Sequence, residues 1–376
     1  MITLNGCSSG NFSPIIGEVT FSGKPFYDRK NAILATNNLD RKSLGYKGCI
    51  TSGEKGKFYH PDHIYNFSDM QRLHEGDIVV LNKNGEIIVV WEAGSEQNAL
   101  FLTENCNCNC IMCPQPPNNS KSDFFIKEAN VILDIIRSRD EKYICITGGE
   151  PTEVRKDFLK ILKRCVDEHP NACINILTNG KNFSDKSLID EVKQIKLENV
   201  IFCVSFHSDV DILHDYIAGS KGSFKKTQIG LYNLAKIGAK IEIRTVVSRL
   251  NFNYLPRIAE HFYNYFPFCV HYAFMGMEVK GLADKNKDKL LISPIEFKQQ
   301  LRNAVLKMVQ RGLNVSIYNL PLCCIDEDVR SYACQSISTW KNSFIDKCEP
   351  CKLKEKCAGF FTTSSFIHVD DINPIA

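Results

Sequence analysis

The chain has 376 residues, of which 44% are hydrophobic and 24% are charged, and Lys and Arg exceed Asp and Glu by 46 − 43 = 3. This length suits an α/β barrel of about 200 to 250 residues with two smaller modules. The near-neutral charge gives little support for a nucleic-acid partner, and no stretch approaches the ~18 apolar residues of a membrane span.

The first 98 residues are expected to form a β-rich module. Its clearest element is a hairpin, with apolar runs at 76–81 and 86–91 joined through Asn84-Gly85. Two β-branched runs joined by Asn-Gly are a strong hairpin signal, and the shorter glycine-punctuated runs before them suit a small barrel. The module carries no recognisable catalytic residues, so it is expected either to bind a partner or to act as a scaffold.

From residue 99 to residue 312, short apolar runs alternate with helical stretches, which is the sequence form of repeated β/α units. This predicts an α/β fold with a partial (β/α)6 barrel of the TIM type, closed by a helix at 294–311. Catalytic residues of such folds gather at the carboxyl ends of the strands. Strands are expected at 99–103, 143–147, 173–177, 200–206, 240–247 and 269–274, and helices at 127–137, 156–168, 184–194, 223–237 and 254–265.

Four cysteines follow the first predicted strand, at 106, 108, 110 and 113. Cys106, Cys110 and Cys113, spaced C-x3-C-x2-C, offer three thiolates to an iron–sulfur cluster that needs four ligands, so one iron stays open to another molecule. Cys108 does not fit this spacing and is predicted not to be a ligand. Zinc or buried thiols are the alternative, although zinc sites usually add a second ligand pair nearby.

The seventeen cysteines of the chain gather mainly in two loop regions, which favours metal sites over disulfides. With no recognisable export signal, the expected location is the reducing cytoplasm. Cysteines inside apolar strand-like runs are expected to be core residues, since a free cysteine packs as a small hydrophobe. These are Cys145, Cys173, Cys203 and Cys269.

Polar motifs follow the later predicted strands. In Gly148-Gly149-Glu150-Pro151 the glycines permit close backbone approach, and the carboxylate of Glu150 can accept hydrogen bonds from an ammonium group. Thr178-Asn179-Gly180 ends the third strand, and Ser205-Phe206-His207-Ser208 ends the fourth. Arg244 lies in the fifth strand and is equally consistent with a core role, while His207 and His214 are expected to be satisfied polar residues.

The cysteine spacing, with the Gly148–Pro151 turn one β/α unit later, resembles the radical S-adenosylmethionine (SAM) superfamily. The resemblance implies a [4Fe–4S] cluster on Cys106, Cys110 and Cys113 whose open iron binds SAM and cleaves it to a 5′-deoxyadenosyl radical. Met112 replaces the usual aromatic residue before the last cysteine, and its thioether can still cover the adenine. The other implied SAM contacts are Gly148, Gly149, Glu150, Pro151, Asn179, Ser205, Arg244 and Val246.

Residues 313–376 contain the second cysteine-rich region. Cys348, Cys351 and Cys357 form C-x2-C-x5-C, and Cys323 is the preferred fourth thiolate, although Cys324 and Cys334 are further candidates. Four thiolates satisfy a second [4Fe–4S] cluster, and zinc is the rival. The pattern resembles the auxiliary-cluster extension called SPASM or, with one cluster, twitch.

The run from Cys110 to Pro117 and Gly359-Phe360-Phe361 make the chain similar to the C-component radical SAM maturase of the His-Xaa-Ser system. This implies a ribosomally made peptide or protein with His-Xaa-Ser repeats as substrate, a second radical SAM protein as partner and an external electron donor. An oxidative modification is expected, with His271 and Glu278 as candidate acid–base residues that are more often structural. The alternatives are a radical SAM enzyme acting on RNA or a small metabolite, and a non-catalytic iron–sulfur or zinc protein.

Overall fold

The computed structural model describes residues 2–10, 12–37, 43–54, 60–118, 122–363 and 372–375. The chain divides into two compact units, which are described separately. The first unit holds Met1–Phe101, Asp123–Cys145 and Asp167–Cys173, and the second holds Leu102–Ser122, Ile146–Val166 and Ile174–Ala376. The predicted three-part division at residues 98 and 312 stays a prediction.

The first unit contains an eight-stranded sheet in the order β1-β8-β7-β3-β4-β5-β6-β2. The two end strands follow one another in the chain and are separated only by Gly6, so the sheet closes on itself. The expected hairpin is confirmed, because β7 and β8 pair antiparallel. The strands are β1 (Ile2–Asn5), β2 (Cys7–Ser8), β3 (Ile15–Thr20), β4 (Ala32–Thr36), β5 (Gly48–Thr51), β6 (His63–Tyr65), β7 (Ile78–Leu81) and β8 (Glu86–Trp91), with short 3-10 helices η1 (Phe26–Asn31) and η2 (Met70–Arg72).

A second eight-stranded sheet runs in the order β9 to β16, and its pairings from β11 to β16 are parallel. The six predicted strands are all present. β15 and β16 were not predicted, because both are short and β15 places the polar Ser316 within its apolar run. The strands are β9 (Ala99–Phe101), β10 (Tyr143–Thr147), β11 (Cys173–Thr178), β12 (Val200–Ser205), β13 (Lys240–Val246), β14 (His271–Met275), β15 (Val315–Tyr318) and β16 (Ala333–Cys334).

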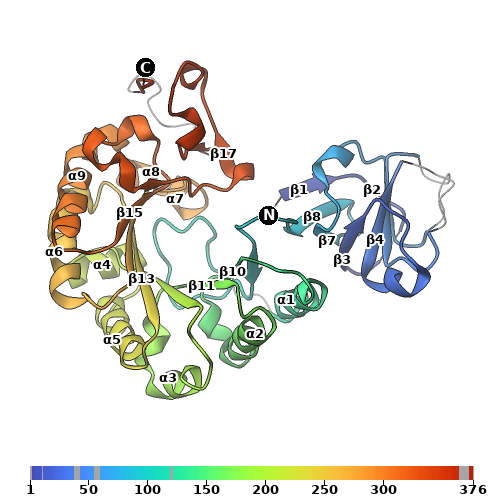
Figure 1. Ribbon diagram of the computed structural model, residues 1–376, viewed down its shortest axis with the longest axis horizontal. Coiled ribbons are helices and arrows are strands. Elements are labelled where there is room, and N and C mark those ends of the chain that lie inside the picture. Colours follow the sequence, from blue (N-terminus) through green and yellow to red (C-terminus); the bar gives the residue numbers. More distant parts are fainter. Residues whose placement is uncertain are drawn as a thin grey trace. The chain divides into compact units, whose positions relative to one another are not determined.

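The helices predicted from sequence are present, and α9 begins as expected with Pro294 in its first turn and a Ser293 and Glu296 capping box. Helices α3, α5, α6 and α9 lie along the outer side of the curved sheet (Figure 1). Helices α4, α7 and α8 were not predicted. The helices are α1 (Asp123–Ile136), α2 (Arg155–Glu168), α3 (Lys186–Val192), α4 (Asp211–Ala218), α5 (Ser223–Lys236), α6 (Leu255–Tyr265), α7 (Leu282–Lys285), α8 (Lys287–Leu290) and α9 (Pro294–Gln310).

The expectation that four strand cysteines are core residues holds for Cys203 and Cys269, which are buried. It is wrong in part for Cys145 and Cys173, which are only half-buried. Side chains alternate between the two faces of a strand, so Cys145 points to the opposite face from the fully buried Ile144 and Ile146. The apolar character of a run did not reveal which face each cysteine occupies.

Beyond β16 the described chain is mostly short 3-10 segments, with a small antiparallel pair, β17 (Asn342–Ser343) and β18 (Phe360–Phe361). The 3-10 segments there include η9 (Asp346–Cys348) and η10 (Lys354–Lys356), whereas η6 (Leu322–Cys324) lies between β15 and β16. Within the described ranges, none of the helices combines the length and the apolar character that a membrane crossing needs.

Candidate active site

The loop that carries the first cysteine group is fixed through its backbone by two separate elements. The backbone N–H of Glu150 donates to the carbonyl of Asn105 at 2.8 Å, just after β10. At the other end of the loop, the N–H of Asn109 donates to Ala218 O at 3.1 Å, at the end of α4. The loop is therefore held in one conformation by hydrogen bonds that need no particular side chain.

Two glycines make this close approach possible. A Cβ on Gly149 would lie 2.4 Å from the carbonyl oxygen of Asn105, and one on Gly219 would lie 2.0 Å from that of Asn109. Both distances are far shorter than a carbon–oxygen contact, so any larger residue would displace the loop. Gly219 also has φ +58°, in the left-handed region that favours glycine. Gly149, in the glycine pair after β10, thus allows the close backbone approach to the cysteine loop that was expected of this pair.

The four thiols of the loop differ in exposure. Cys106, Cys110 and Cys113 are half-buried, whereas Cys108 is buried. Cys106 and Cys110 donate hydrogen bonds to the sulfur of Cys108, which lowers the pKa of Cys108 and raises the pKa of its two neighbours. Cys108 therefore lies among the predicted ligands, and its assignment as a non-ligand stays a prediction.

The donor set of this loop fits an iron–sulfur cluster. The sulfur of Cys106 accepts hydrogen bonds from the backbone N–H of Cys108 at 3.4 Å and from the side-chain amide of Asn179 at 3.8 Å. Hydrogen bonds to sulfur stabilise cluster thiolates and tune their potential. In the described part of the chain no three His, Cys, Asp or Glu side chains gather around a single ion position. A cluster does not require this, because each thiolate binds a different iron.

Glu150 is fully buried and its carboxylate is occupied by hydrogen bonds from the protein. It accepts from the hydroxyl of Thr152 at 2.6 Å, the hydroxyl of Thr178 at 2.9 Å and the backbone N–H of Asn179 at 2.8 Å. Burial raises the pKa of this carboxyl, and the hydrogen bonds oppose that rise. Glu150 thus joins the turn after β10 to the turn after β11. The predicted contact of its carboxylate with the SAM ammonium stays a prediction.

A cavity of about 540 Å³ lies at the carboxyl ends of the strands. Its wall includes Cys110, Met112 and Cys113 from the loop, together with Ser205, Arg244 and Val246 from β12 and β13. Six of the residues predicted to bind the cluster or SAM are therefore brought to one cavity. The other predicted SAM residues, Gly148, Gly149, Glu150, Pro151 and Asn179, are not among its described lining residues.

Arg244 is a cation on the cavity wall that is also paired within the sheet. Its guanidinium donates to Glu242, whose other oxygen lies 2.7 Å from Nδ1 of His271. Burial alone raises the pKa of Glu242, but His271 and Arg244 bring it below its ordinary value. Nε2 of His271 lies 2.8 Å from the Ser316 hydroxyl. Both ring nitrogens of His271 thus have partners, which agrees with the structural role expected for it.

His207 was not selected as a site residue from the sequence, yet it lines the cavity and is buried. Its Nδ1 has no hydrogen-bond partner among the described residues, and burial lowers the pKa of its imidazole to about 3. The expectation that His207 is a satisfied polar residue is therefore wrong. The sequence offered one signal, because His207 lies two residues after Ser205, which was predicted to contact SAM. The sequence alone could not show that the His207 side chain lines the cavity.

The far wall of the cavity comes from the region after β14. The carboxylate of Glu278 accepts a 2.8 Å ion-paired hydrogen bond from Lys341, and the hydroxyl of Ser336 donates to the side-chain oxygen of Asn319 at 2.8 Å. All four residues line the cavity. The ion pair with Lys341 therefore balances the charge of Glu278, as expected for a structural residue. Asn319 and Ser336 still give this wall polar groups.

In the second cysteine-rich region, Cys357 is buried and its sulfur accepts the backbone N–H groups of Leu322 at 3.3 Å and Gly359 at 3.4 Å. A hydrogen bond from Cys324 lowers the pKa of Cys323 to about 7. Cys323 is half-buried, Cys324 is buried and Cys334 is exposed. Nearby donors to sulfur suit a bound thiolate. The assignment of Cys323, Cys348, Cys351 and Cys357 as ligands of one site stays a prediction.

Residues 100–262 match the family described as the radical SAM superfamily. An uncharacterized protein of Methanocaldococcus jannaschii is 29% identical over 54% of this chain and 68% of its own length. The AdoMet-dependent heme synthase of Methanosarcina barkeri is 24% identical over 47% of each protein.

The sporulation killing factor maturation protein SkfB of Bacillus subtilis is 24% identical over 43% of this chain and 38% of its own length. Among solved structures, SuiB of Streptococcus suis with bound S-adenosylmethionine has a TM-score of 0.47 and 16% identity, and the match covers 58% of this chain and 49% of that one. The chain thus spans less than half of the length of the heme synthase and of SkfB. Residues 100–262 of this chain are therefore similar to the radical SAM superfamily, whose enzymes use a [4Fe–4S] cluster and S-adenosylmethionine.

Proposed function

We propose that this protein is a radical SAM maturase that modifies a ribosomally made peptide. The observation that carries the proposal is the single cavity of about 540 Å³, which joins Cys110 and Cys113 to the strand-end residues and to the polar wall around Asn319 and Ser336. Such a cavity can hold SAM against the cluster at one side and leave the other side for substrate.

In this proposal Cys106, Cys110 and Cys113 hold the cluster through three of its irons. When bound, the cluster supplies the electron that cleaves SAM to methionine and a 5′-deoxyadenosyl radical. The fixed backbone of the loop keeps the thiolates in place, and Asn179 hydrogen-bonds the sulfur of Cys106.

SAM would be bound by groups that already face the cavity. Arg244 keeps a positive charge that suits the SAM carboxylate, since the neighbouring Glu242 counteracts the effect of burial on the guanidinium pKa. Ser205 supplies a hydroxyl for a ribose or carboxylate oxygen, and Val246 and Met112 offer apolar surface for the adenine. The remaining predicted SAM residues are proposed to position the cysteine loop and to complete the SAM site. They are Gly148, Gly149, Glu150, Pro151 and Asn179.

Cys323, Cys348, Cys351 and Cys357 are proposed to hold a second, fully ligated [4Fe–4S] cluster of the SPASM or twitch type. Four thiolates leave no iron open, so this cluster suits electron transfer and would accept the electron left when the substrate forms a new bond. That role favours an oxidative product. Zinc at the same cysteines is the alternative, and metal analysis separates the two.

The peptide class of the substrate is supported by the relative named as a sporulation killing factor maturation protein. The finer assignment, a peptide with His-Xaa-Ser repeats processed with a second radical SAM protein, rests on the resemblance of the cysteine motifs. An external electron donor is required to reduce the cluster. A cytoplasmic location is proposed from the free cysteines, because disulfides are rare in that compartment.

A small-molecule substrate is the second candidate, since another relative is named as a heme synthase. The experiment that separates them is co-expression with the genes that neighbour this one, followed by mass spectrometry of the small peptide products. A loss of about two hydrogens would support an oxidative cross-link or desaturation by the cofactor chemistry above. Unchanged peptides in cells where the protein actively cleaves SAM would count against a peptide substrate.

A further inference from the structure

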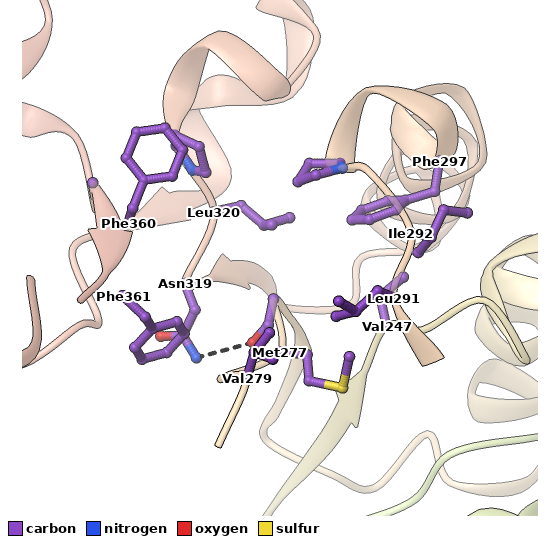
Figure 2. A pocket seen from close by; sticks show the side chains of 14 residues that line it. Val247, Met277, Val279, Leu291, Ile292, Phe297, Asn319, Leu320, Phe360 and Phe361 are labelled. Atoms are coloured by element: carbon purple, nitrogen blue, oxygen red, sulfur yellow. Dashed lines mark hydrogen bonds between the residues drawn. The ribbon is translucent and has the colours of Figure 1, made fainter. Parts of the chain in front are cut away.

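An apolar pocket of about 70 Å³, shown in Figure 2, shares lining residues with the larger cavity. Leu320 and Phe360 approach it from one side and Leu291 and Phe297 from the other, as Figure 2 shows. Its lining contains no charged side chain. The amide of Asn319 on its wall donates to the carbonyl of Gly276 at 3.4 Å. A polar or charged ligand would therefore find few partners in this pocket.

The size of the pocket limits what can enter it. An apolar cavity of about 150 Å³ holds a benzene molecule, so about half that volume is too small for an aromatic ring and suits a few aliphatic carbons. A buried water needs two to four polar partners, and the lining offers little beyond the Asn319 amide. The chemistry of the pocket therefore selects a short aliphatic group.

The pocket adjoins the candidate active site. Gly276, Met277, Asn319 and Phe361 line both the pocket and the cavity that contains Cys110 and Cys113. A chain lying along the polar wall of the larger cavity can therefore insert one side chain into the pocket without leaving the site. Leu320 and Val279 line only the pocket.

We propose that this pocket is a specificity subsite that binds one aliphatic side chain of the substrate, of the Val, Leu or Ile class, next to the residue that is modified. The proposal rests on the proposed function in taking the substrate to be a peptide. Anchoring a neighbouring side chain fixes the register of an extended chain, which selects the residue that reaches the radical. Aromatic and charged residues are excluded at this position by size and by the lack of partners.

Methionine-methyl NMR tests the proposal without requiring turnover. Met277 lines the pocket, Met275 lines only the larger cavity, and Met70 belongs to the first unit. The probes are N-acetyl-leucine methylamide and its glycine and phenylalanine counterparts. We expect the leucine probe to shift the Met277 signal saturably and more than the Met275 signal, to leave Met70 unchanged, and to bind at least tenfold more tightly than either counterpart.

Filling and enlarging the pocket complete the test. Leu320→Phe should weaken binding of the leucine probe at least tenfold, and Leu320→Ala, which needs no extra space, should shift the preference toward the phenylalanine probe. Equal responses to the three probes, or no change in either variant, would overturn the subsite. If the leucine probe binds as expected but no peptide is modified in cells, the aliphatic subsite stands and the proposed peptide substrate fails.

Discussion

The carboxyl group of Glu150 accepts a 2.8 Å hydrogen bond from the backbone N–H of Asn179, so two turns from neighbouring strands meet at one buried acidic side chain. The amide of Asn179 in turn reaches the sulfur of Cys106. The Gly-Gly-Glu-Pro and Thr-Asn-Gly turns thus act together on the cysteine loop. We propose that their first task is to position the predicted cluster ligands.

Glu150→Gln should therefore destabilise the protein and weaken SAM binding while iron content is retained. The new NH2 group would face the Thr152, Thr178 and Asn179 donors, and an unmatched buried polar group costs about 1 to 3 kcal/mol. Denaturant unfolding and equilibrium SAM binding check this. Glu153→Gln is the matched control, because its carboxylate accepts only exposed or half-exposed amide donors, such as that of Asn107. Equal stability of the two variants would contradict the role given to Glu150.

Gly219→Ala should release the cysteine loop. Its Cβ would lie 2.0 Å from the Asn109 carbonyl, in addition to the cost of about 1 to 2 kcal/mol for a left-handed residue. Gly222→Ala separates the two effects, because Gly222 also has positive φ but no heavy atom within 4 Å of its Cβ position. We expect Gly219→Ala to lose at least about 2 kcal/mol more than Gly222→Ala and to bind less iron. Similar unfolding curves and iron contents would refute this.

Stability should fall as the pH is lowered below 6.5. Burial lowers the pKa of His214 to about 4, so the folded protein keeps this imidazole neutral while the unfolded chain binds the proton. The stabilising contribution is complete above the unfolded pKa and is lost as pH falls toward the folded pKa. His214→Gln should reduce the loss between pH 6.5 and 5 by about 1.5 kcal/mol. Parallel pH profiles for the two proteins, measured by urea unfolding of the metal-free form, would contradict it.

Cys357→Ala should remove the second cluster and leave the first. Iron should fall from about eight to about four atoms per chain, while SAM cleavage persists. Cys323→Ala should behave in the same way, whereas Cys324→Ala and Cys334→Ala should keep all the iron. Zinc in place of the missing iron in the native protein, or loss of iron in the Cys334 variant, would require a different ligand set.

The sequence predicted those features that depend on local spacing. The three cysteines, the glycine pair and the six strand runs are local patterns, and the six strands were found where expected. Helix α4 was missed because it has only eight residues between two turns, yet its last residue, Ala218, holds the cysteine loop. A short helix stabilised mainly by tertiary contacts leaves a weak periodic signal.

Contacts between distant segments could not be predicted. The unpaired Nδ1 of His207 and the contact of Glu150 with Asn179 both depend on how segments distant in the sequence pack side by side. The aliphatic pocket is built from segments as distant as Leu291 and Phe360. None of these segments forms the pocket by itself, so only the folded chain reveals the site that they form together.

The most direct test of the central assignment is SAM cleavage by anaerobically reconstituted, reduced protein with and without Cys110. The native protein and Cys108→Ala should both form 5′-deoxyadenosine and methionine and hold about eight irons. Cys110→Ala should form neither product, because a cluster ligand is lost, while it keeps the roughly four irons of the second site. Undiminished formation of 5′-deoxyadenosine by Cys110→Ala would contradict the account.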